Sequence, residues 1–198
     1  YKTFKDFLIK QGGTFLGTNS KGNPFKFKIN GKYENASKRI ASAYKSLKLD
    51  GLIVIGGDGS MNILKKIADS ERLNIVGIPK TIDNDVGSTE YSIGFHTAVD
   101  CATKALDSLQ STAASHRRAM VLEVMGRDAG HIALNAGIAG GADIILIPEL
   151  KFTIDGIIKK LNEIKKNKIG YSLIIVAESV KKESGEKILN NYYKQKRF

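Results

Sequence analysis

Short, mainly apolar runs alternate with longer amphipathic segments along most of this chain. The runs, rich in β-branched residues, lie at 52–55, 74–78, 119–124, 143–147 and 171–177. The amphipathic segments span 35–49, 95–109, 130–138 and 154–166, with a further helix expected from Ser60. Such alternation predicts an α/β fold in which helices cover both faces of parallel sheets. Ligands of these folds bind beyond the carboxyl ends of strands, so the loops that follow strands are the candidate site.

Composition narrows the class of protein further. The 198 residues carry a net charge of +11, but most of the excess lies in Lys159–Phe198, where few aromatic residues accompany it. We therefore expect anionic small molecules, and no nucleic acid, as partners. No apolar run approaches the ~20 residues that span a bilayer, so no membrane segment is expected. Cys101, the single cysteine, is expected in the core, and with no secretory signal it indicates a cytoplasmic protein.

The first candidate loop is Gly56–Ser60 (GGDGS), which follows the run at 52–55 and opens a helix. Its glycines would let backbone amides approach a phosphate, which the helix N-terminus also attracts. Asp58 would repel that phosphate unless a divalent cation lay between them, and carboxylate oxygens suit Mg²⁺. The simpler interpretation is a glycine turn with Ser60 as the helix cap.

The second candidate loop is Pro79–Asp85 (PKTIDND), which follows a strand that Pro79 is expected to end. Because parallel strands end at the same edge of a sheet, this loop is expected to meet the first one. In an extended chain Thr81, Asp83 and Asp85 share one side, whereas one helical turn would separate Asp83 from the others. A metal at Asp85 would leave Asp83 to accept a proton, and a solvated acidic turn is the alternative.

The third candidate loop is Met125–His131 (MGRDAGH), in which Arg127 can fork two hydrogen bonds onto a phosphate. Arg118 precedes the strand that Arg127 follows. A strand of about six residues at ~3.3 Å each keeps the two arginines roughly 20 Å or more apart. One chain would struggle to aim both at one ligand, and a symmetric partner could supply one of them. A surface ion pair is the simpler interpretation of either arginine. His116 and His131 are expected to cap or pack rather than to bind metal.

The three loops, with the linking segments GGTFLG (12–17) and IAGGADIILIPE (138–149), resemble the 6-phosphofructokinase family. The resemblance covers residues 11–178, with the three motifs in family order. It implies a Rossmann-like fold of two similar α/β lobes. We divide them at 94/95, with part of a donor-binding lobe before and part of a sugar-phosphate-binding lobe after. The implied reaction is transfer of the ATP γ-phosphoryl group to the 1-hydroxyl of fructose 6-phosphate in glycolysis, with Mg²⁺ as cofactor and fructose 1,6-bisphosphate as product.

The resemblance also implies roles for individual residues. Asp83 would be the base for the sugar hydroxyl, with Arg127 and Thr81 also catalytic. The residues implied to bind the donor are Gly57, Asp58, Gly59, Ser60, Lys21 and Lys80. Those implied to bind the sugar phosphate are Thr81, Asp83, Asp85, Met125, Gly126, Arg127, Glu178 and, from a neighbouring subunit of a homodimer or homotetramer, Arg118. The implied metal ligands are Asp58 and Asp85.

Two positions resemble different branches of the family. The lysine at position 80 resembles the residue that the pyrophosphate-using branch carries there. The glycine at position 59 resembles the ATP-using branch, whose members have no carboxylate at that position to crowd the nucleotide. Some lineages combine both residues and use ATP, so ATP is the expected donor and pyrophosphate the alternative. A non-catalytic regulatory or scaffold homologue is another alternative. Kinases of the diacylglycerol or NAD kinase type also have a GGDG loop. The motif TIDND followed by MGR distinguishes this chain from them.

The ends of the chain depart from the family pattern. The chain opens at Tyr1 with a stretch, 1–10, expected to form an amphipathic helix, and the family's first strand is expected upstream of it. The family's arginine and histidine residues that bind the 6-phosphate of the sugar are expected beyond Phe198. We therefore expect the chain to be a fragment without turnover of its own.

Overall fold

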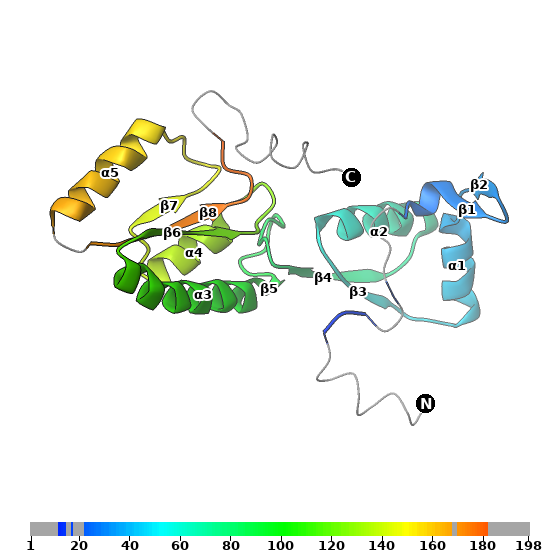
Figure 1. Ribbon diagram of the computed structural model, residues 1–198. Helices are drawn as coiled ribbons and strands as arrows, with labels where there is room; N and C mark the ends of the chain where they lie inside the picture. The colour runs from blue at the N-terminus through cyan, green and yellow to red at the C-terminus, as the bar shows by residue number, and fades with distance from the viewer. Residues whose placement is uncertain (1–11, 15–16, 18–21, 168–169, 182–198) are drawn as a thin grey trace. The chain divides into compact units, whose positions relative to one another are not determined.

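The computed structural model describes residues 12–14, 17, 22–167 and 170–181 (Figure 1). The expected helix over 1–10 and Lys21 lie outside these residues. The elements follow the order η2 (Pro24–Lys26), β1 (Phe27–Ile29), β2 (Lys32–Glu34), α1 (Ser37–Ser46), β3 (Leu52–Gly56), α2 (Asp58–Glu71), β4 (Ile75–Thr81), β5 (Ile93–Gly94), α3 (Phe95–His116), β6 (Ala119–Val124), α4 (His131–Ala139), β7 (Ile144–Leu146), α5 (Ile154–Lys166) and β8 (Ser172–Ala177). Within the described residues, no helix is long and apolar enough to cross a membrane.

The described chain divides into two compact units. The first comprises the described residues up to Leu52 together with Asn62–Val76, and the second comprises Ile53–Met61 with the described residues from Gly77 onward. Buried side chains of α1, α2 and the turn after α2 form the core of the first unit: Ala41, Ile67 and Leu73. All three candidate loops belong to the second unit. The lobe boundary at 94/95 stays a prediction.

The second unit contains a parallel sheet in the order β6-β8-β7. Helices α3 and α4 contact the strands on one face of this sheet, and α5 lies on its other side (Figure 1). The central strand β8 is buried along nearly its whole length, which explains its continuous apolar sequence. The core between the sheet and the two helices centres on Phe95, Leu106 and Ile175, each at most 2% exposed. The expected α/β fold with parallel strands is confirmed.

A second sheet has the order β3-β4-β5, with β4 and β5 parallel. The expectation that Pro79 ends its strand is wrong, because β4 continues through Pro79 to Thr81. Proline lacks a backbone N–H and is tolerated where no ladder bond requires one. The pairing with β5 begins only at Lys80, which lies opposite Ile93.

Two burial expectations are also wrong. Cys101 is exposed, because the face of α3 that meets the core passes through Ala102 and Leu106 instead. In β3 Val54 is 9% exposed, whereas its neighbours Ile53 and Ile55 are 67% and 59% exposed. The strand expected to be buried on both faces therefore buries only one face against the described residues.

Candidate functional site

The first two candidate loops meet in the second unit, as expected from their places at a shared sheet edge. A methyl group built on Gly57 would lie 3.8 Å from both the Thr81 Cβ and the Lys80 carbonyl oxygen. Helix α2 begins at Asp58, so the interpretation of Ser60 as its cap is wrong, and Ser60 lies inside the first turn. A methyl group on Gly59 would meet no described atom within 4 Å. The glycine loop thus presents an open surface beside the end of β4.

The second loop turns sharply after β4 instead of continuing as an extended chain. The Thr81 hydroxyl donates to Asp83 Oδ2 at 3.3 Å, and Asp83 N donates to Thr81 Oγ1 at 3.2 Å. The next residue, Asn84, has φ 55°, in the left-handed region that asparagine tolerates better than most residues. The extended arrangement is therefore wrong in detail, but the turn keeps both Asp83 and Asp85 in one loop beside Thr81.

The third loop is held by two carboxylates from other strand ends. Glu178 Oε1, directly after β8, accepts hydrogen bonds from Arg127 N at 2.6 Å and Gly126 N at 3.3 Å. Glu149 Oε1, after β7, accepts from Gly130 N at 2.7 Å. Gly126 has φ 149°, and a side chain there would clash with the Ala129 carbonyl oxygen. The backbone of this loop is therefore fixed at both ends.

Electrostatics join the second and third loops. Arg127 Nη1 lies 3.9 Å from Asp85 Oδ2, and the Asp85 side chain is 25% exposed. Partial burial, then the Asp85 carboxylate and the charge of Glu178, raise the pKa of Asp83. The hydrogen bond from Thr81 and the charge of Arg127 oppose this rise. A carboxylate with a raised pKa beside a guanidinium is an arrangement suited to accepting a proton next to an anionic group.

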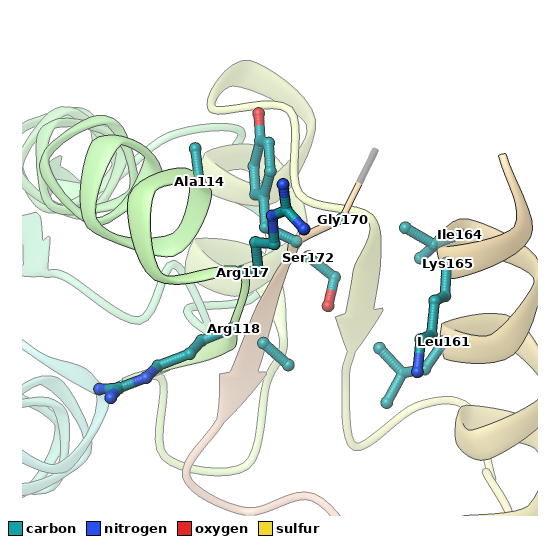
Figure 2. Close-up of a pocket in the computed structure, with 10 residues that line it drawn as sticks. Ala114, Arg117, Arg118, Leu161, Ile164, Lys165, Gly170 and Ser172 are labelled. Atoms are coloured by element: carbon teal, nitrogen blue, oxygen red, sulfur yellow. The ribbon is translucent and has the colours of Figure 1, made fainter. Parts of the chain in front are cut away.

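The structure also places three other predicted site residues: Met125, Lys80 and Arg118. Met125, directly after β6, is 60% exposed, and Lys80, the penultimate residue of β4, is also exposed. Arg118 precedes β6 and Arg127 follows it, so the two lie at opposite ends of the strand. Arg118 lines a pocket of about 830 Å³ beside the amino ends of β6 and β8, with Arg117 and Lys165 (Figure 2). The structure therefore does not bring Arg118 to the Asp83 cluster of the same chain.

Acidic residues of the two adjoining loops could hold a magnesium ion only with other ligands. No group of three or more His, Cys, Asp and Glu residues gathers as a metal site among the described residues. Mg²⁺ binds through one or two carboxylates and completes its shell with waters and phosphate oxygens. Asp58 and Asp85 lie in loops that adjoin through Gly57 and Thr81, and their carboxylates are of the ligand type that such a site uses.

Sequence reasoning missed three residues that shape these loops: Asn84, Ser92 and Glu149. Ser92 is 3% exposed and its hydroxyl donates to the Thr81 carbonyl oxygen at 2.8 Å. Asn84 and Glu149 bond to backbone groups of other segments. A serine three residues before a helix was the only signal in the sequence, and its partner 11 residues earlier could not be read from spacing.

Known proteins resemble the chain along nearly its whole length. The Phosphofructokinase family matches residues 2–197. ATP-dependent 6-phosphofructokinase 1 of Synechocystis sp. is 55% identical over 92% of this chain and 51% of its own length. Pyrophosphate--fructose 6-phosphate 1-phosphotransferase of Amycolatopsis methanolica is 43% identical, over 92% of this chain and 51% of its own length.

The chain is also similar in fold to a solved structure. The structure of phosphofructokinase from Saccharomyces cerevisiae superposes with a TM-score of 0.72 and 31% identity, covering 89% of this chain and 26% of that one. The chain spans about half the length of the curated relatives that it matches. On the family match and these identities, the chain belongs to the phosphofructokinase family.

Proposed function

We propose that the full-length protein is a 6-phosphofructokinase. It transfers the γ-phosphoryl group of ATP to the 1-hydroxyl of fructose 6-phosphate, giving fructose 1,6-bisphosphate in glycolysis. Family membership supports this assignment. The observation that carries it is the cluster of Asp83, Asp85 and Glu178 around Arg127, built from loops at the ends of three strands.

Asp83 is the base that accepts the proton of the sugar hydroxyl. Its raised pKa lies closer to the pH at which the enzyme works than that of an ordinary aspartate, which suits a general base. Arg127 stabilises charge on the transferring phosphoryl group, which matters most in a loose transition state. Thr81 orients Asp83 through its hydroxyl. Asp85, Met125, Gly126 and Glu178 complete the sugar-phosphate side.

The donor binds along the first loop, with its phosphates at Gly57, Asp58, Gly59 and Ser60 and with Lys80 and Lys21 near them. Asp58 and Asp85 would hold Mg²⁺, which neutralises phosphate charge when bound. ATP is the proposed donor because Gly59 leaves open space where a carboxylate would crowd a nucleotide. Pyrophosphate is the alternative, supported by Lys80 and by the pyrophosphate-dependent relative. Initial rates with MgATP and with Mg-pyrophosphate decide between the two donors.

Arg118 serves a neighbouring subunit's site in a homodimer or homotetramer. Its position at the end of β6 opposite Arg127 supports this role, because one chain does not aim both arginines at one ligand. In the full-length protein, Arg118→Ala should weaken fructose 6-phosphate binding, and mixing this variant with Asp83→Ser should restore some activity in hybrid oligomers.

We also propose a cytoplasmic location, which the exposed free thiol of Cys101 suits.

Substitution of the base tests the assignment. Asp83→Ser in the full-length protein should lower kcat by about 100-fold or more, while KM for fructose 6-phosphate changes little. The matched control is Asp69→Ser, an exposed carboxylate on α2 whose loss should leave both constants unchanged. An unaltered kcat in Asp83→Ser would remove Asp83 from the mechanism. Sugar-phosphate binding without turnover in the wild-type protein would favour the non-catalytic homologue.

A further inference from the structure

Asn84 occupies the turn between the two aspartates, and its side chain reaches across the loop. Its Oδ1 accepts from Ser92 N at 2.8 Å, and its Nδ2 donates to the Glu90 carbonyl oxygen at 3.1 Å. These two backbone groups flank Tyr91. The amide therefore offers that segment a donor and an acceptor, as a backbone peptide group does in a parallel pair of strands. The bridge ties the Asp83–Asp85 turn to the chain that enters β5.

Ser92 closes the same loop from the other side. Its hydroxyl lies 2.8 Å from the Thr81 carbonyl oxygen and 3.2 Å from Asn84 Oδ1, and the shorter contact takes its single proton. The residue is 3% exposed, so water does not readily replace this bond. Directly after it, Lys80 and Thr81 pair with β5 at Ile93 and Gly94. Both ends of the loop are thus fixed around the residues that carry the carboxylates.

We propose that Asn84 and Ser92 are positioning residues that hold Asp83 and Asp85 in their working directions, an inference that rests on the proposed function. Asn84 supports the left-handed turn between the aspartates, at φ 55°, by bonds that a glycine would lack. Ser92 fixes the Thr81 peptide, and Thr81 in turn bonds to Asp83. Neither residue needs to touch substrate to act in this way.

The test separates positioning from folding by pairing two substitutions with a control in the same loop. Asn84→Gly keeps the left-handed backbone accessible and deletes only the side-chain bridge. Ser92→Ala deletes only the hydroxyl. Ser88 also has a positive φ, 61°, but is exposed, so Ser88→Gly is the matched control. Each variant is made in the full-length protein and measured for kcat, KM for fructose 6-phosphate and melting temperature.

We expect kcat to fall by about 10-fold to 100-fold in Asn84→Gly and Ser92→Ala, because small displacements of reacting groups have effects of this size. KM should stay within about threefold, the melting temperature should change by only a few degrees, and the control should match wild type. A kcat within about twofold of wild type in both variants overturns the inference. Loss of cooperative unfolding in both also overturns it, because the residues would then serve the fold. A wild-type protein inactive with both donors overturns the proposed function and this inference together.

Discussion

Replacing Glu178 with alanine should release the loop that carries Arg127. The carboxylate accepts backbone hydrogen bonds from Arg127 N at 2.6 Å and from Gly126 N at 3.3 Å. A hydrogen bond to a charged group contributes about 1.5–3 kcal/mol, and the longer bond contributes less than the shorter one. Because solvent reaches part of Glu178, water replaces some of the lost bonding. We therefore expect Glu178→Ala to lower the free energy of unfolding by about 2 kcal/mol.

Urea-induced unfolding of the full-length protein, followed by circular dichroism, measures this loss. Glu178→Gln keeps an oxygen acceptor without the charge, so its loss should be about half as large. Glu123→Ala removes an exposed carboxylate from the neighbouring strand β6 and should stay within about 0.5 kcal/mol of wild type. If Glu178→Ala were no less stable than Glu123→Ala, the carboxylate would not hold the loop, and the reasoning would be refuted.

Two further predictions concern Asp83 and Gly59. Because burial and the Asp85 carboxylate raise the pKa of Asp83 above its ordinary value of 3.8, its ionisation favours the unfolded chain. Asp83→Asn should therefore raise the melting temperature at neutral pH, with a gain that shrinks through the raised pKa and is absent below pH 3.8; a gain persisting in acid contradicts this. Gly59→Asp has space among the described residues and should fold normally. Its carboxylate should lower kcat/KM for MgATP relative to Mg-pyrophosphate, and an unchanged ratio would argue against Gly59 facing the donor.

Much of the fold could be predicted because its long elements have clear patterns. The strand at 119–124 and the helix at 154–166 match β6 and α5 residue for residue. Helix α3 extends seven residues past the predicted end at Leu109, because Ala113, which is fully buried, continues the core-facing stripe among polar neighbours. The helical spacing of apolar residues continues to Ala113, but the polar residues around it made the end of the helix hard to predict from the sequence.

The candidate site was predictable only at the level of loops. Loops after parallel strands share a sheet edge, and this rule predicted that the first two loops would meet. The structure shows the contact to be between Gly57 and Thr81. The bonds that aim the side chains were not predictable, since they join side chains to backbone groups far away in sequence. Glu149 bonds to the amide of a residue 19 positions earlier, and no spacing rule marks such a pair.

The two loops that carry Asp83 and Arg127 share one physical feature. Each has a residue other than glycine in the left-handed region, Asn84 with φ 55° and Arg127 with φ 53°. For a residue such as arginine this conformation costs roughly 1 kcal/mol, so it persists only where the surroundings hold it. The holding bonds come from elsewhere in the chain, from Ser92 and Glu178. Because those bonds offset strain at the turns, their loss should disturb the direction of the reactive groups before it unfolds the sheets beneath them.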